Sequence, residues 1–287
     1  MADFWKGVAK KLTKDIAIDL GASCVRVYVE GEYRNPEEGI LVEEPSMVAV
    51  NKDTRRVECI GAEARNMIGR VPRHIELIRP TTNLSVFEKE IVLEMLQYYI
   101  RKACDKTWLP PRVVITTPTA TSNLGKEALM DAAREAGARR TYLLEEIQAA
   151  ALGAGVDYLS PNGVVVVNIG SCVTEAALFA SGGIVRSETI PVGGDDFDYA
   201  IMDYIYEEYG IQINKTSAEE VKRLIGNAFP QNESAWAKIS GSSREDGLRR
   251  EDFIYSRETL GAMYQPIEAI LRLIDDMINF MIDATQP

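Results

Sequence analysis

The chain has 287 residues, of which 46% are hydrophobic and 26% charged, so it can form a hydrophobic core and lacks the composition of a disordered protein. Its formal net charge of −11 argues against nucleic acid as a partner, because no basic surface large enough to follow a phosphate backbone is predicted. No apolar stretch approaches the ~20 residues of a membrane span, and no apolar signal-peptide core follows Met1, which favours a cytosolic protein.

The cysteines and the single histidine argue against the commonest metal and disulfide sites. Cys24, Cys59, Cys104 and Cys172 stand far apart and form no Cys-x-x-Cys pair. The histidine, His74, lies in a basic, turn-like stretch typical of a surface. Any catalysis would therefore depend on carboxylates, hydroxyls, a bound metal or backbone dipoles.

Residues 1–14 predict a basic amphipathic helix. At about 100° per residue, one arc carries apolar side chains and the opposite side carries lysines. The apolar arc is Phe4, Trp5, Val8, Ala9 and Leu12, and the lysines are Lys6, Lys10 and Lys14. We expect this helix to bind an anionic membrane surface weakly, and more firmly when a polymer displays many copies. The alternative is an ordinary terminal helix that packs on the protein body.

Two segments about 150 residues apart share a pattern of strand, tight turn and returning strand. The first contains Asp19-Leu20-Gly21 and the second contains Asn168-Ile169-Gly170, each after an apolar, strand-like run. The repetition predicts a duplicated domain with one hairpin in each half.

The remaining chain alternates helical and strand patterns, as an α/β protein does. Helices are predicted at 88–101, 124–136, 145–152, 195–209, 217–225 and 259–282, and a strand at 112–118. Ser217 and Glu220 predict a capping box for one helix, and Pro266 is expected in the early part of the last helix or at a kink within it. Residues 233–252 are polar and predict a loop or a hairpin.

Two opposed hairpin turns can hold the phosphates of a nucleotide. Glycines let the backbone approach phosphate closely, and short hydroxyls add hydrogen bonds. An acidic residue at the end of each strand would hold Mg²⁺, usually through its waters. The chain has no P-loop and no Gly-x-Gly-x-x-Gly motif, so the duplicated turns are its candidate phosphate site.

Several segments resemble the MreB family of bacterial actins. They are 19–21, 39–46, 66–70, 78–80, 144–151, 192–195, 218–222 and 225–230. The resemblance runs in one order from about Asp15 to the end of the chain. It implies an α/β, actin-like (duplicated ribonuclease-H-like) fold of two lobes with ATP and Mg²⁺ in the cleft between them. It also implies membrane-bound antiparallel double filaments that guide cell-wall synthesis in rod-shaped bacteria.

The resemblance also implies boundaries and partners. We expect a first lobe at 15–158 with a small inserted subdomain at about 32–78, and a second lobe at 159–287 with a small subdomain at about 191–255. The expected partners are further copies or a more typical paralogue, the inner face of the cell membrane, and the cell-wall synthesis machinery. On this basis the protein is cytoplasmic and peripheral to that membrane.

The candidate site residues follow from the same match. The nucleotide-binding set is Asp19, Gly21, Ala22, Ser23, Cys24, Gly170, Ser171, Cys172, Glu219, Glu220 and Lys222. Asp19 and Asn168 hold the metal positions, and Glu146 occupies the position that orients the attacking water. The membrane set is Phe4, Trp5, Val8, Leu12, Trp108 and Leu109.

Each of these assignments has a purely structural alternative. Glu146 suits the start of a helix, where the dipole favours a carboxylate. Glu219, Glu220 and Lys222 suit an exposed helix with local ion pairs. Trp108 and Leu109 would otherwise pack on the body of the protein.

The departures from the family pattern lie at the phosphates. Ala22 and Cys24 stand where the family has Thr and Asn, which removes a hydroxyl and an amide. Asn168 stands where the family has Asp, and residues 171–173 read Ser-Cys-Val instead of Gly-Gly-Thr. A neutral amide attracts a metal less than a carboxylate, and the added side chains, above all β-branched Val173, occupy space that phosphate needs. We therefore predict weakened or lost ATP binding and hydrolysis.

The chain stops at Pro287, where the family continues to a glycine-rich adenine loop and terminal helices. This predicts either a short paralogue whose second lobe repacks or a truncated remnant. The leading hypothesis is a divergent MreB-like protein that joins or regulates filaments. The alternatives are an ordinary ATP-dependent MreB, a sugar-kinase-like or chaperone-like ATPase of the same fold, and a non-functional fragment. A kinase would need a substrate domain, and the sequence shows none.

Overall fold

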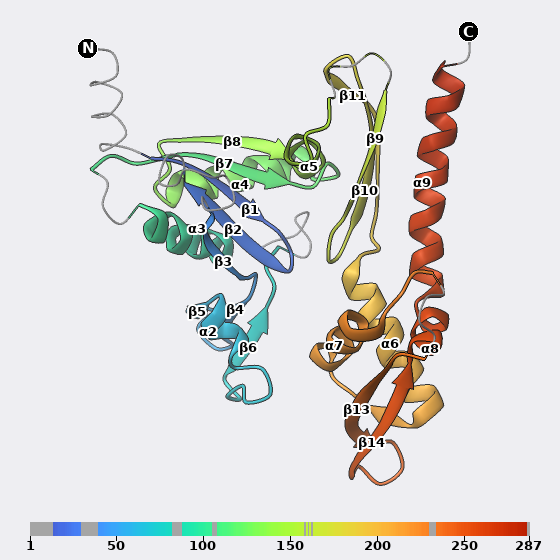
Figure 1. Cartoon of the computed structure of the whole chain (residues 1–287). Coiled ribbons are helices and arrows are strands. Elements are labelled where there is room, and N and C mark those ends of the chain that lie inside the picture. The colour runs from blue at the N-terminus through green and yellow to red at the C-terminus, as the bar shows by residue number, and fades with distance from the viewer. Residues whose placement is uncertain are drawn as a thin grey trace, which may run out of the picture. The chain divides into compact units, whose positions relative to one another are not determined.

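The computed structural model describes residues 14–29, 40–81, 88–104, 108–157, 159, 161, 163–229 and 234–285. The chain divides into two compact units, Met1–Val156 and Asp157–Pro287, and Figure 1 shows the elements of each. The predicted N-terminal helix, apart from Lys14, lies outside the described residues. No helix in the described part of the chain is long and apolar enough to cross a membrane.

The first unit is built on a mixed sheet. Among its described residues five strands follow the order β3-β2-β1-β7-β8. They are β1 (Asp15–Leu20), β2 (Cys24–Val29), β3 (Ile40–Pro45), β7 (Arg112–Thr117) and β8 (Arg140–Glu145). The first three are antiparallel neighbours, and β7 and β8 extend the sheet parallel to β1. The predicted first hairpin and the predicted strand at 112–118 are confirmed.

Three helices of the first unit confirm the predicted helical periodicity. They are α3 (Lys89–Ala103), α4 (Asn123–Glu135) and α5 (Glu146–Gly153). α3 packs against α4 and against β2 and β3. Met95, Leu96 and Tyr99 of α3 are fully buried in the core that also contains Ile18 and Val27 of the sheet. This core fixes the strands whose ends carry the candidate site.

A small sheet is inserted between β3 and α3. Its order is β5-β4-β6 among the described residues, and α2 packs on it. The elements are β4 (Val48–Asn51), β5 (Val57–Ile60), α2 (Ala62–Arg65) and β6 (Ile75–Ile78). Glu44, just before this insertion, accepts hydrogen bonds from Tyr98 and pairs with Lys102 of α3. These contacts fix the end of β3 against α3, and Val48, Val50 and Ile60 of the insertion are buried in the same core.

The second unit repeats the antiparallel part of the first. The described strands β9 (Val164–Ile169), β10 (Thr174–Ala180) and β11 (Gly183–Ile190) form a sheet of order β11-β10-β9. The long helix α9 (Tyr264–Thr285) lies along this sheet (Figure 1). Leu273 and Met277 of α9 are buried against Ala176 and Leu178 of β10. The second predicted hairpin is confirmed.

The rest of the second unit forms its own core. It contains α6 (Gly194–Tyr209), β12 (Ile211–Gln212), α7 (Lys215–Ile225), β13 (Trp236–Ser243), β14 (Arg249–Tyr255) and α8 (Ser256–Ala262). Ile201 and Ile205 of α6 are fully buried in this core. Val221 of α7 and Ile239 of β13 pack in the same core and are almost fully buried. The polar segment at 233–252 is therefore a hairpin, one of its two predicted forms.

The predicted capping box of α7 is wrong. The helix begins at Lys215, and Asn214 is its cap: the Asn214 side chain accepts a hydrogen bond from the Ser217 amide at 2.9 Å. Asn and Ser are comparable N-caps, so residue preference alone did not separate the two positions. Ser217 therefore lies inside the first turn, where its amide is the donor that the cap satisfies.

The predicted helix at 259–282 is two helices. α8 ends at Ala262, Met263 follows it, and α9 begins at Tyr264. Pro266 lies in the first turn of α9, where an amide would have no partner within the helix, so the missing N–H costs no hydrogen bond. In a continuous helix the Pro266 ring would clash with the Ala262 carbonyl, so of the two predicted roles of this proline the interruption of the helix is the one observed.

Candidate functional site

The first candidate turn joins β1 to β2 at residues 21–23, and three hydrogen bonds fix its carbonyl groups. The Thr81 hydroxyl donates to the Gly21 carbonyl at 3.0 Å, Arg79 Nε to the Ala22 carbonyl at 2.9 Å, and the Ser46 amide to the Ser23 carbonyl at 2.9 Å. Ser46 and Thr81 also share a hydrogen bond of 2.8 Å between their hydroxyls. Residues flanking the inserted sheet therefore determine the shape of this turn.

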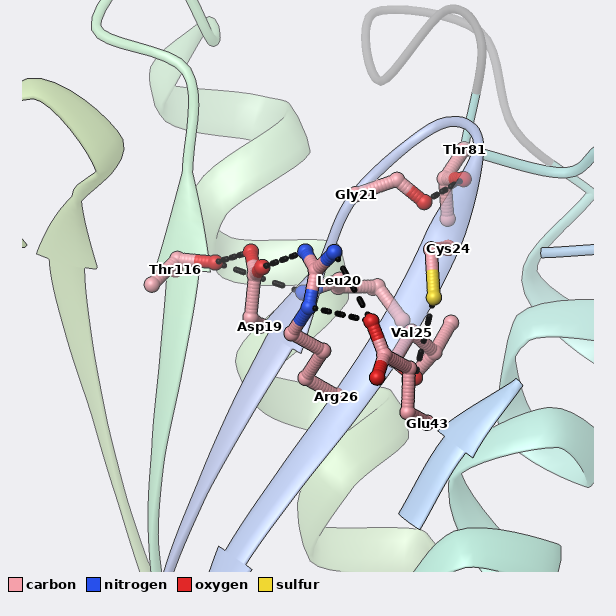
Figure 2. A network of polar contacts seen from close by, with 9 residues as sticks. All are labelled: Asp19, Leu20, Gly21, Cys24, Val25, Arg26, Glu43, Thr81 and Thr116. Carbon is pink, nitrogen blue, oxygen red and sulfur yellow. Dashed lines mark hydrogen bonds and ion pairs between the residues drawn. The ribbon is translucent and has the colours of Figure 1, made fainter. Parts of the chain in front are cut away.

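Asp19 lies at the end of β1, where a metal-attracting carboxylate is predicted. Its Oδ1 accepts a hydrogen bond of 2.9 Å from the Thr116 hydroxyl, which in turn accepts from the Leu20 amide at 3.3 Å. Its Oδ2 accepts from Nη1 of Arg26 at 3.4 Å. Arg26 is directly opposite Asp19 in the register of β1 and β2. Figure 2 shows the carboxylate between Thr116 and the guanidinium.

The same guanidinium contacts a second carboxylate. Arg26 Nε and Nη2 both lie 3.0 Å from Oε1 of Glu43, which is opposite Arg26 on β3. The Arg26 side chain is 45% exposed, so each ion pair on its own adds little to stability. Their importance is positional, because they place a permanent positive charge beside Asp19.

Cys24 starts β2 in place of an amide residue of the family. Its thiol donates to the Val25 carbonyl, with a sulfur–oxygen distance of 3.7 Å. Burial raises the pKa of the Cys24 thiol, and the nearby charge of Arg26 opposes that rise. The thiol is therefore neutral at pH 7 and replaces the amide with a weak hydrogen-bond donor.

The first turn does not fit a divalent cation. Its carboxylate, Asp19, is already shared by a hydroxyl and a guanidinium. A divalent cation about 4 Å from the guanidinium would be repelled by about 2 kcal/mol even in water. Within the described ranges no group of three or more His, Cys, Asp or Glu residues could hold a metal.

The second candidate turn joins β9 to β10 and is bound to the start of α6. The amides of Gly194 and Asp195 donate to the carbonyls of Gly170 and Ser171, at 2.9 and 2.7 Å. A Cβ at Gly193 would lie 2.7 Å from the Gly170 carbonyl oxygen, so this close approach requires glycine. The turn thus satisfies the first amides of the helix with its own carbonyl groups.

Asn168 is the last residue but one of β9, at the position where the resemblance predicts a carboxylate. In the hairpin register it lies opposite Glu175 of β10, whose side chain is buried. The acid of this strand end is therefore on the returning strand and inside the protein. The half-buried Asn168 contributes an amide and no charge.

Lys222 of α7 connects α7 to the start of α6. Its Nζ donates to the Gly194 carbonyl at 2.6 Å and pairs with Oδ1 of Asp198 at 2.6 Å. The Asp198 side chain is 3% exposed; burial raises its pKa, and the hydrogen bond and charge of Lys222 oppose that rise. Glu219 is half-buried and Glu220 exposed on the same helix. A candidate nucleotide-binding lysine therefore already has two protein partners.

The remaining candidates of the first unit lie at element ends. Glu146 is the first residue of α5 and is half-buried, as both a water-orienting role and a helix-start role would allow. Trp108, between α3 and β7, is 88% exposed, and Leu109 is also exposed. The structure therefore does not show them packed into the body. Phe4, Trp5, Val8 and Leu12 lie outside the described residues.

A hollow of about 600 Å³ in the second unit lies among α6, α8 and α9. Its polar lining comprises Asp196, Asp203, Glu207, Glu208, Tyr199, Tyr204 and Gln265. Carboxylates repel phosphate, so this hollow is not a phosphate site.

Comparison with known proteins establishes the family. The family model described as "MreB/Mbl protein" matches residues 13–283. The chain belongs to the MreB/Mbl family. The cell shape-determining protein MreB of Escherichia coli (strain K12) is 33% identical over 268 residues, which cover 91% of this chain and 76% of the relative. The cell shape-determining protein Mbl of Bacillus subtilis (strain 168) is 35% identical over 267 residues, covering 93% and 78%.

Solved structures agree with this assignment. A crystal structure of MreB5 of Spiroplasma citri bound to AMPPNP has a TM-score of 0.85 and 30% identity, covering 96% of this chain and 80% of that chain. A MamK double helical filament has a TM-score of 0.71 at 20% identity, covering 96% and 81%, and supports the fold alone. The predicted family and the predicted α/β, actin-like fold are confirmed.

In this MreB/Mbl chain, the contacts of Arg26, Thr116 and Asp198 were not predicted from the sequence. The contact of Arg26 could have been predicted from the hairpin register. If Leu20 and Val25 pair next to the turn, antiparallel pairing places Asp19 opposite Arg26. Thr116 and Asp198 had none, because their partners come from elements distant in sequence.

Proposed function

We propose that this chain is a cell-shape-determining filament protein that binds adenine nucleotide weakly and has weakened or lost ATP hydrolysis. It assembles with further copies or with a more typical MreB relative, on the inner face of the cell membrane, and organises cell-wall synthesis there. The family and the names of the relatives support the cell-shape role. The proposed lobes are 15–158 and 159–287.

The hydrogen bonds and side chains of the β9–β10 turn are the main support for weak nucleotide binding. Two of its carbonyls accept hydrogen bonds from the α6 amides, which fixes it against the helix. Ser171, Cys172 and Val173 add side chains to the turn, where phosphate would need bare backbone. Asn168 supplies no negative charge for a hydrated cation.

Calorimetric titration with Mg-ATP tests this proposal. We expect the dissociation constant of the natural chain to be far above the micromolar range and its steady-state hydrolysis to be undetectable. The variant Asn168→Asp, Ser171→Gly, Cys172→Gly, Val173→Thr restores the family pattern and should bind at least tenfold more tightly. Cys59→Ala, which removes a thiol outside both turns, should bind as the natural chain does.

The second candidate function is an ordinary ATP-dependent filament protein. The nucleotide-bound Spiroplasma relatives and the position of Glu146 at the start of α5 favour it. Micromolar binding of Mg-ATP by the natural chain, with phosphate release that rises on assembly, would contradict weak binding and establish this alternative.

Exposure of Trp108 supports membrane association. Burial of a large apolar side chain contributes about 1.5–3 kcal/mol, so the pair Trp108 and Leu109 can change membrane affinity more than tenfold. In co-sedimentation with anionic liposomes, removal of residues 2–14 and the variant Trp108→Ser, Leu109→Ser should each reduce pelleting. Trp236→Ser, which removes an exposed tryptophan of the second unit, is the matched control. Equal pelleting of all forms would contradict the membrane proposal.

A further inference from the structure

We infer that Arg26 is a built-in replacement for the divalent cation at Asp19. Its Nη1 lies 3.4 Å from Oδ2 of Asp19 near the end of β1, so the protein itself places a cation beside this carboxylate. The inference deepens the proposed weak nucleotide binding and rests on it for its biological meaning.

The register of three strands forces this arrangement. Arg26 of β2 pairs with Asp19 of β1 on one side and with Glu43 of β3 on the other. Residues directly opposite each other on adjacent strands point to the same face of a sheet, so the three side chains form a row. Figure 2 shows the guanidinium between the two carboxylates.

The chemistry of the row favours an arginine over a metal. A guanidinium remains charged at every physiological pH, and its several N–H groups contact both carboxylates at 3.0 and 3.4 Å. Thr116 takes the other oxygen of Asp19. A divalent cation would have to displace Arg26 or lie beside a like charge. Without Arg26, Asp19 and Glu43 would be two carboxylates on one face, a donor pair of the kind that Mg²⁺ and Mn²⁺ prefer.

The chain contains a matched control for this chemistry. Arg186 of β11 pairs with one carboxylate, that of Glu188, at 3.2 Å, and its side chain is 39% exposed against 45% for Arg26. Replacing Arg186 therefore removes the same charge from a similarly exposed position without freeing a pair of carboxylates and without touching the candidate phosphate turn.

Titration of the full chain with Mn²⁺, followed by electron paramagnetic resonance of the free ion, tests the inference. Arg26→Gln should bind one Mn²⁺ at least tenfold more tightly than the natural chain. Asp19→Asn added to Arg26→Gln should abolish the gain, and Arg26→Lys, which keeps the charge, should resemble the natural chain. Arg186→Gln should leave the affinity unchanged. Circular dichroism melts confirm that each variant is folded.

Two results would overturn the inference. One is equal Mn²⁺ affinity of the natural chain and folded Arg26→Gln; the other is an equal gain in Arg186→Gln, which would show a general effect of charge. The titration contains no nucleotide, so its outcome is separate from the proposed function, whose failure would appear as tight binding and hydrolysis of Mg-ATP.

Discussion

Lys222 holds two groups of the second unit at one ammonium. It donates to the Gly194 carbonyl at the start of α6 and pairs with Asp198 one turn further along that helix. Because the Asp198 carboxylate is almost completely buried, its charge depends on this partner. Lys215 and Glu219 also contribute to the field at Asp198, with opposite signs.

Replacing Lys222 with methionine should destabilise the protein in a pH-dependent way. A buried carboxylate without its partner costs about 3–5 kcal/mol of unfolding free energy. Burial already raises the pKa of Asp198, and loss of Lys222 raises it further. A group with a raised folded-state pKa stabilises the fold at low pH and loses that contribution as pH rises through the pKa. We therefore expect a larger loss at pH 8 than at pH 5, measured by urea unfolding at both values.

The control variant removes the carboxylate charge of Asp198 as well as its partner, Lys222. Asp198→Asn in the Lys222→Met background should recover much of the stability and most of the pH independence. Equal destabilisation by Lys222→Met at pH 5 and pH 8 would show that packing, and not the charge of Asp198, dominates.

At the scale of elements, the start of α7 gives a direct comparison of two capping residues. Asn214→Ala removes the acceptor for the Ser217 amide and should lower the unfolding free energy by about 1 kcal/mol. Ser217→Ala removes a hydroxyl that has no capping role here and should change it by less than about 0.5 kcal/mol. Urea midpoints of the two variants measure the difference, and the reverse order would restore Ser217 as the cap.

Most elements could be predicted because their periodicity is strong. The first hairpin and the helices α3, α4 and α6 follow alternating or helical apolar patterns that burial confirms. The second hairpin was recognisable from its apolar run and its turn residues, although burial does not alternate along β9 and β10. β8 has no such signal: its residues Arg140–Glu145 are exposed or half-buried without regular alternation. The break at Met263 had a signal in Pro266, because a proline disfavours a continuous helix through the residue four positions before it, although the pattern did not fix the residue at which the first helix ends.

At the scale of the whole molecule, duplication made the fold predictable and tertiary contacts made the site only partly so. The two antiparallel hairpins, β1–β2 and β9–β10, appear in the sequence as one repeated pattern. The turn residues were found for the same reason. Their partners were not, because Thr81, Thr116 and Lys222 reach the turns or the adjoining helix from segments 28 or more residues away. Sequence patterns describe local geometry, whereas these contacts exist only after folding.

The close approach at Gly193 has a mechanical consequence within the second unit. Short hydrogen bonds link the β9–β10 turn directly to the first residues of α6. Lys222 links helix α7 to the same residues. Such a linkage transmits displacement, since densely packed groups deform little. A displacement of the β9–β10 turn is therefore expected to move α6 and α7 with it, so that the turn and the two helices shift together.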